Sequence, residues 1–195
     1  QRIMSLGSRQ CLIITAPSGA GKSTLIKALM AKYPALFQFS ISATTRAPRQ
    51  GEVDGQHYHF LSSKAFKTAQ ANNAFLEWEE VYTGLFYGTL RSEVTRIQSI
   101  GAIPLFDIDV NGGLSLQKKI DPKPVSIFIK PPSKALLEQR LIDRNTESAE
   151  SLRVRLARYE YEISQETSFD YVIMNDDLDR ASSSLFMLID KHFAR

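Results

Sequence analysis

The chain has 195 residues, of which 43% are hydrophobic and 23% charged, as is typical of a globular protein with one sizeable core. Its net charge of +3 is small and dispersed, which argues against a nucleic-acid-binding surface. No run reaches the roughly 18 apolar residues of a membrane span, and the single cysteine, Cys11, excludes an intrachain disulfide. We expect a cytoplasmic monomer or homodimer that binds neither nucleic acid nor membranes, with Met4 close to its natural start.

Strand and helix patterns alternate along most of the chain. The apolar run at 11–15 predicts a buried strand, a glycine-rich loop follows it, and 23–33 have the spacing of a helix that stops before Pro34. Further short apolar runs predict buried strands at 103–109, 125–130 and 170–175. Helical patterns accompany them at 90–100, 133–144, 149–167 and 178–193. This alternation predicts an α/β fold with a parallel sheet and right-handed crossovers.

Residues 39–87 interrupt the alternation. Short strand-like stretches are separated there by a loop rich in glycine and proline and by one short helix near 63–72. We expect a small, mostly antiparallel insertion on the parallel-sheet core.

The stretch APSGAGKST at 16–24 nearly fits the phosphate-binding pattern G-x-x-x-x-G-K-[ST], with Ala16 in place of the first glycine. In such a P-loop, backbone N–H groups at a helix N-terminus surround a phosphate. We expect Lys22 to reach the β- and γ-phosphates of a nucleoside triphosphate and the Ser23 hydroxyl to bind Mg²⁺. Ala16 can hold the first position if its φ is negative, which the following proline favours.

Two further groups of polar residues could contact a ligand. Asp107 and Asp109 end an apolar strand, where carboxylates of a parallel sheet meet Mg²⁺ or a substrate; alternatively, they cap the next helix. Arg46 and Arg49 stand three apart in a rigid loop, a spacing suited to gripping a phosphate, although an ordinary surface loop would explain these charges equally well.

Seven stretches together resemble the guanylate kinase family, in the same order and over nearly the whole chain from Cys11 onward. They are PSGAGKST, FSISATTRAPRQGEVDGQHYHF, FLEWEEVY, YGT, DIDVNGG, IFIKPPS and VIMNDDLDRA. The resemblance implies transfer of the γ-phosphoryl group of ATP to GMP, and also to dGMP, with Mg²⁺ as cofactor. Many bacterial members of the family also have alanine at the first P-loop position, as this chain does at Ala16.

The resemblance also implies the P-loop nucleoside monophosphate kinase fold, in a single domain of residues 1–195. Its parallel-sheet core would comprise about 9–40, 90–143 and 165–195. A small mixed or antiparallel GMP-binding subdomain would occupy about 41–89, and a helical lid about 144–164.

Carried over by position, the resemblance assigns both substrates. It places ATP against Ala16, Pro17, Ser18, Gly19, Ala20, Gly21, Lys22, Ser23, Thr24, Arg144 and Asn175. It places the phosphate of GMP against Arg46, Arg49, Tyr58 and Tyr87, and the base against Ser42, Glu77, Thr89 and Asp107. Ser23 and Asp107 would hold Mg²⁺, directly or through water.

Glu77 is the expected source of selectivity for guanine. One ionised carboxylate can accept the adjacent N1 and 2-amino donors of guanine, whereas adenine has an acceptor at N1 and no 2-amino group. A site built for these hydrogen bonds can discriminate on the order of 10⁴-fold. The alternative interpretation of Glu77 is an exposed residue on a strand, alternating with its apolar neighbours.

The resemblance assigns catalysis to positive charge around the transferred phosphoryl group, supplied by Lys22, Arg46, Arg140, Arg144 and Arg155. Arg153 and Arg158, on the same expected helix, are interpreted as a solvated charged face. Two stretches depart from the family pattern. Asn145 replaces the glycine of the usual Arg-Gly-Thr-Glu lid sequence, and Leu85 and Phe86 stand where Asn and Tyr are common.

Two other functions stay open on the sequence alone. Guanylate kinase-like modules of scaffold proteins bind phosphorylated partners without catalysis, but their P-loops are degraded, whereas Lys22 and Ser23 are both present here. A related P-loop kinase would phosphorylate another small phosphate-bearing acceptor, such as a ribose bisphosphate, and the expected guanine contacts argue against that.

Overall fold

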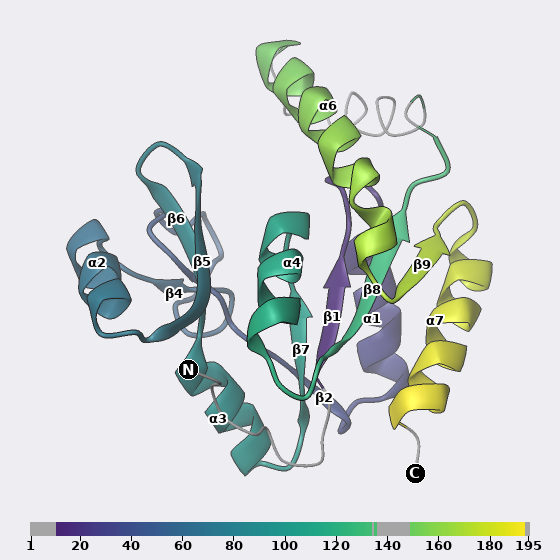
Figure 1. Ribbon diagram of the computed structural model, residues 1–195, viewed down its shortest axis with the longest axis horizontal. Coiled ribbons are helices and arrows are strands. Elements are labelled where there is room, and N and C mark those ends of the chain that lie inside the picture. The colour runs from purple at the N-terminus through teal and green to yellow at the C-terminus, as the bar shows by residue number, and fades with distance from the viewer. Residues whose placement is uncertain (1–10, 134, 136–148, 194–195) are drawn as a thin grey trace.

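The chain folds around two separate β-sheets (Figure 1). The structure is a computed structural model, and it describes residues 11–133, 135 and 149–193. A five-stranded sheet forms the centre of the molecule, and a four-stranded sheet stands beside it as an insertion. Among the described residues, no helix combines the length and apolar character that crossing a membrane requires.

The five-stranded sheet is parallel throughout, in the order β2-β7-β1-β8-β9. Its strands are β1 (Leu12–Thr15), β2 (Phe37–Phe39), β7 (Ile103–Asp107), β8 (Val125–Lys130) and β9 (Tyr171–Met174). Strands β1, β7 and β8 are almost entirely buried, as expected for a parallel sheet covered on both faces. All five strands point the same way, so their carboxyl ends meet at one edge of the sheet.

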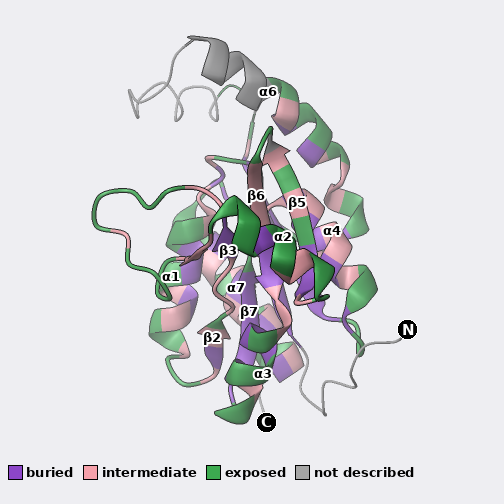
Figure 2. Cartoon of the chain, turned by 90° about the vertical axis from the view of Figure 1, so that its left-hand side faces the viewer, coloured by how far each residue is buried: buried purple, intermediate pink, exposed green. Residues whose placement is uncertain are grey.

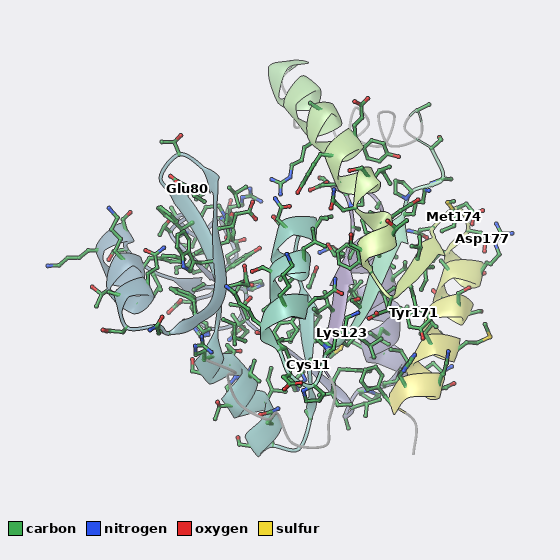
Figure 3. The ribbon with its side chains drawn as sticks, in the orientation of Figure 1. Cys11, Glu80, Lys123, Tyr171, Met174 and Asp177 are labelled. Carbon is green, nitrogen blue, oxygen red and sulfur yellow. The ribbon has the colours of Figure 1, made fainter. Side chains whose placement is uncertain are left out.

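Helices cover both faces of this sheet, and buried side chains gather between the layers (Figure 2). On one face, α1 (Lys22–Lys32) and α7 (Leu178–Phe193) pack against the strands in the largest hydrophobic cluster. On the other face lie α3 (Arg91–Ser99) and α4 (Val110–Lys119). The chain between β8 and β9 includes α6 (Ala149–Ser164) and a short 3-10 helix (Glu166–Ser168). Cys11 is buried just before β1 (Figure 3).

The insertion has its own small core. Its sheet has the order β4-β3-β6-β5, and only the β3–β4 pairing is parallel within it. The elements are β3 (Ala43–Thr44), β4 (His59–Phe60), α2 (Ser63–Ala71), β5 (Phe75–Tyr82) and β6 (Leu85–Leu90). Phe66 of α2 is fully buried and stacks on Phe75, with their ring centroids 4.5 Å apart. Ala43 completes this cluster, which is distinct from those of the central sheet.

The predicted α/β fold with a parallel sheet is confirmed. Most predicted strands and helices are observed, but α4 at Val110–Lys119 was not among the predicted helices. Its first turn contains Gly112 and Gly113, which lower helix propensity, and a Cβ at Gly113 would lie 3.1 Å from the Phe169 ring. The helix expected at 149–167 ends at Ser164. The helix expected at 133–144 lies outside the described residues, and the proposed subdomain boundaries stay predictions.

Replacing Phe66 with alanine should destabilise the fold by about 3–5 kcal/mol, because it leaves a cavity under α2 where the ring packs on Phe75 and Phe86. Urea denaturation measures this loss. Lys67→Ala, on the exposed side of the same helix, is the matched control and should change stability by less than about 0.5 kcal/mol. Equal losses in the two variants would contradict the packing argument.

Candidate active site

The loop between β1 and α1 has the geometry of an anion-binding turn. Gly19 and Gly21 have φ of 83° and 85°, values that favour glycine, and α1 begins directly afterwards at Lys22. No acidic residue lies in the first turn of α1, so its N–H groups and dipole present positive potential to the loop. Among the described non-glycine residues only Asn73 has a positive φ, so Ala16 meets the expectation of a negative φ.

Asn175 supports this loop from the end of β9, which is separated from β1 by β8 in the sheet. Its side-chain Nδ2 donates to the backbone oxygen of Ala20 at 2.7 Å, and Asn175 is buried just after β9. A Cβ on Gly21 would collide with the same Nδ2 atom. The glycine at position 21 is therefore required by its positive φ and by this contact.

Lys22 and Asp107 form an ion pair across the site. Lys22 is the first residue of α1, and Asp107 ends β7, the strand adjacent to β1 in the sheet. Lys22 Nζ also lies 3.4 Å from the backbone oxygen of Ile108. The side chains are 21% and 33% exposed, so an incoming phosphate or cation can reach both groups.

A cavity of about 590 Å³ opens between the P-loop and the inner side of the insertion. It is lined by all nine P-loop residues, 16–24, and by five of the residues expected to bind GMP or Mg²⁺: Ser42, Tyr58, Glu77, Tyr87 and Asp107. Residues from two separate sheets therefore meet around one space large enough for nucleotide groups.

Glu77 of β5 is buried at the wall of this cavity, with 6% of its surface exposed. The Thr89 hydroxyl of β6 donates to Glu77 Oε1 at 2.6 Å. Burial raises the pKa of Glu77 to about 7, although the hydrogen bond from Thr89 lowers it. The interpretation of Glu77 as an exposed strand residue is wrong, and Thr89 lies behind the carboxylate rather than on the lining.

The four expected phosphate-binding residues all lie on the insertion, but its two arginines are not among the residues that line the cavity. Tyr58 and Tyr87 line it, and their ring centroids are 5.9 Å apart. The Arg46 guanidinium carbon lies 5.3 Å from the centroid of the Tyr58 ring. Arg46 also donates two hydrogen bonds to the Glu52 carboxylate, at 2.8 and 2.9 Å. These bonds and the hydrogen bond from the Arg49 backbone N–H lower the pKa of Glu52 to about 2. Arg49 is exposed, and its backbone N–H donates to Glu52 at 2.6 Å.

Sequence reasoning missed a group of charged residues on the same cavity wall. Asp109 caps α4 by accepting from the Gly112 N–H at 2.8 Å, which was the alternative interpretation of that aspartate. Its other oxygen pairs with Arg158, so the interpretation of Arg158 as part of a solvated face is wrong. Glu162 and Glu79 also line the cavity. The spacing of Arg158 and Glu162, four residues apart on a helix, was the available signal.

The arginines expected to act from the lid are only partly placed. Arg140 and Arg144 lie outside the described residues, as does Asn145. Arg155 belongs to α6, but its side chain is not described. Their catalytic roles stay predictions.

The P-loop follows the central strand of a parallel sheet and faces a separate small sheet across a cavity. Together with the buried Glu77 carboxylate on the cavity wall, this arrangement defines a P-loop nucleoside monophosphate kinase. The guanylate kinase family model matches residues 8–192. The chain therefore belongs to the guanylate kinase family, enzymes that transfer phosphate from ATP to GMP.

Individual relatives agree with this assignment. The chain is 48% identical over 177 residues to the guanylate kinase of Shewanella denitrificans, a match that covers 91% of this chain and 84% of the relative. It is 45% identical over 183 residues to that of Bacteroides fragilis, covering 94% and 89%. Among solved structures, the guanylate kinase of Anaplasma phagocytophilum matches with a TM-score of 0.71 and 28% identity, over 95% of this chain and 87% of that one.

Glu77→Gln should stabilise the substrate-free protein at high pH. A folded-state pKa near 7, above the ordinary 4.5, means that the folded protein binds more protons than the unfolded chain between these values. Stability is therefore lost as the pH rises from about 4.5 through 7. The variant should match the parent near pH 4 and gain up to about 3 kcal/mol at pH 8 in urea denaturation.

The matched control for this prediction is Glu80→Gln on the same strand, because the Glu80 side chain is exposed. It should change stability by less than about 0.5 kcal/mol at either pH. A Glu77→Gln variant whose stability relative to the parent does not depend on pH would refute the buried ionised carboxylate.

Proposed function

We propose that this guanylate kinase joins its two substrates in the cavity between the P-loop and the insertion, with ATP on the loop and GMP on the insertion. The observation that carries the proposal is the buried Glu77 carboxylate, which lines the same cavity as the P-loop and accepts a hydrogen bond from Thr89 behind it. It puts a carboxylate suited to guanine opposite a loop suited to triphosphate.

The ATP half is the nine-residue loop from Ala16 to Thr24, supported by Asn175. Backbone N–H groups at the start of α1 would surround the phosphates, and Lys22 would contact the β- and γ-phosphates. In the free chain Lys22 is paired with Asp107, so ATP has to draw Lys22 away from that carboxylate. Arg144, placed by the family resemblance, would complete the ATP contacts.

The base of GMP would be held by Glu77 together with Ser42, Thr89 and Asp107. The ionised Glu77 would accept from N1 and the 2-amino group of guanine, and the Thr89 hydrogen bond fixes the orientation of the carboxylate. Since adenine lacks these donors, a buried Glu77 would be left without partners in a complex with AMP.

The phosphate of GMP would be held by Arg46, Arg49, Tyr58 and Tyr87. Two guanidinium groups and two phenolic hydroxyls can satisfy the oxygens of a phosphate dianion. Arg46 is held by Glu52 and lies near the Tyr58 ring in the free chain, so its guanidinium is already placed beside the cavity.

Phosphoryl transfer would depend on positive charge at the moving group. Lys22 and Arg46 approach it from the two substrate halves, and Arg140, Arg144 and Arg155 would close over it from the lid. Because these groups belong to different parts of the fold, we propose that the parts close together when both substrates bind, which also excludes water.

The Ser23 hydroxyl and the Asp107 carboxylate would hold Mg²⁺. Both side chains line the cavity, and both supply the oxygen ligands that this ion prefers. Few protein ligands are needed, because Mg²⁺ is commonly bound by one or two protein groups together with water and substrate phosphates. The ion would neutralise charge on the β- and γ-phosphates.

We also propose a cytoplasmic location, a monomer or homodimer, and no nucleic-acid or membrane partner. The small net charge and the single, buried cysteine support this proposal. The use of dGMP as a second acceptor is proposed on the family resemblance.

A coupled assay of ADP release with GMP, AMP, CMP and UMP tests the proposed site. GMP should be the preferred acceptor, and Glu77→Gln should reduce the preference for GMP over AMP by at least about 100-fold. Lys22→Ala should lose turnover while GMP still binds in calorimetry. An unchanged preference in Glu77→Gln would remove Glu77 from the base site.

Arg46→Ala should raise the KM for GMP by about 10- to 100-fold, because hydrogen bonds to a charged group contribute about 1.5–3 kcal/mol. The KM for ATP is the internal control, since Arg46 lies on the insertion rather than near the P-loop; it should change by less than about threefold. Steady-state kinetics with each substrate varied in turn measures both values. A KM for GMP equal to that of the parent would reject the assignment.

A further inference from the structure

Arg158 joins α6 to the start of α4 across the wall of the cavity. Its Nη2 donates to Asp109 Oδ2 at 2.8 Å, and its Nε donates to Glu162 Oε1 at 2.8 Å. Glu162 lies one turn further along α6 with a side chain only 6% exposed, whereas Asp109 is 49 residues away in the sequence. A second hydrogen bond joins the same two helices, because the Tyr161 hydroxyl of α6 donates to Asn111 Oδ1 of α4 at 2.8 Å.

Asp109 lies close to the base-binding carboxylate. Its second oxygen accepts from the Gly112 N–H, so both oxygens have a partner. A Cβ on Gly112 would lie 3.1 Å from Asp109 Oδ1 and 3.6 Å from Glu77 Oε2. The carboxylates of Asp109 and Glu77 therefore lie against the same glycine, and the charge of Asp109 raises the pKa of Glu77 beyond the effect of burial.

Negative charge is concentrated at this end of the cavity. Glu79 of β5 accepts from Asn111 at 3.0 Å, and Glu162 faces the same space from α6. Of the described residues that line the cavity, two are cationic, Lys22 and Arg158, and Lys22 is paired with Asp107. Arg158 is therefore the lining cation that balances the carboxylates around Glu77.

We propose that Arg158 is a positioning residue for GMP, which fixes Asp109 at the start of α4 and balances its charge so that Glu77 stays ionised for guanine. Arg158 acts through Asp109 and need not touch the nucleotide. The inference rests on the proposed function in one respect, namely that Glu77 is the acceptor for the base.

Removing Arg158 would leave the Asp109 charge unbalanced and make ionisation of Glu77 less favourable. The charges that act on Glu77 are those of Glu79 on β5 and of Asp109 and Lys119 on α4. Of the described residues, the other charged ones that line the same cavity are Lys22, Asp107, Arg158 and Glu162. Lys119 also favours the ionised form, but it lies at the far end of α4. The acid limb of GMP binding should therefore move to higher pH in a variant without the Arg158 charge.

Arg158→Gln tests this by calorimetric titration of GMP and by kcat/KM at pH 6 and pH 8.5. If the pKa of Glu77 rises by about half a pH unit, GMP binding should weaken about threefold at pH 6 and less than about 1.3-fold at pH 8.5. Arg158→Lys, which keeps the charge, should show less than half of this effect. The KM for ATP should not change at either pH.

Lys123→Gln is the matched control. Lys123 also holds a carboxylate, Asp170 at 2.7 Å, but it precedes β8 and therefore lies at the edge of the sheet opposite the P-loop (Figure 3). Its GMP affinity should equal that of the parent at both pH values.

A charge-compensating double variant separates charge from folding. Asn is as good a helix cap as Asp, so Asp109→Asn keeps the start of α4 while removing the charge. On its own it should move the acid limb to lower pH. Combined with Arg158→Gln, it should return the affinity at pH 6 to within about 1.5-fold of the parent.

Three results would overturn the inference: unchanged GMP affinity in Arg158→Gln at pH 6, an equal loss at both pH values, or no recovery in the double variant. Glu77→Gln measured alongside shows where a failure lies. If Glu77→Gln does not weaken GMP binding at pH 8.5, the proposed base contact fails. If it does weaken binding and Arg158→Gln behaves as the parent, only the role of Arg158 fails.

Discussion

Strand β1 is buried at the centre of the five-stranded sheet and continues directly into the turn that begins α1. The rest of the phosphate site is arranged around this turn. Its positive-φ glycines fix the direction of α1, Asn175 at the end of β9 holds its backbone, and Asp107 at the end of β7 pairs with its lysine. Because the strands are parallel, three elements distant in sequence supply parts of one phosphate site.

Three cations at or beside the cavity are each held by a carboxylate in the free chain. Lys22 pairs with Asp107, Arg46 with Glu52 and Arg158 with Asp109. These pairs order long side chains before the substrates arrive, which reduces the entropy lost on binding. The substrate phosphates compete with Asp107 for Lys22 and with Glu52 for Arg46. Part of the interaction energy between phosphate and cation is therefore offset by the loss of an existing ion pair.

The sequence predicted the elements with strong periodicity, such as the strand at Val125–Lys130 and the helix at Leu178–Phe193, and the P-loop between the first strand and helix. It missed α4 because Gly112 and Gly113 weaken the helical pattern, and they are tolerated there since α4 packs closely on its neighbours. The resemblance also indicated Glu77, whereas the alternating pattern of its strand suggested an exposed residue. The pairing of Arg158 with Asp109 could not be predicted, because it depends on how α6 crosses the start of α4.

The insertion encloses Phe66 and Phe75 in a cluster of its own, separate from the clusters of the central sheet. Leu76 of β5 is buried in a cluster of the central sheet instead, so only α2 and β6 could open without disturbing that core. Such an opening would expose a small apolar surface and leave the parallel sheet intact. Amide hydrogens of α2 and β6 would exchange through this local opening rather than through global unfolding. A ligand bound to the insertion would slow their exchange selectively, so the acceptor nucleotide also acts as a local stabiliser of the sheet that recognises it.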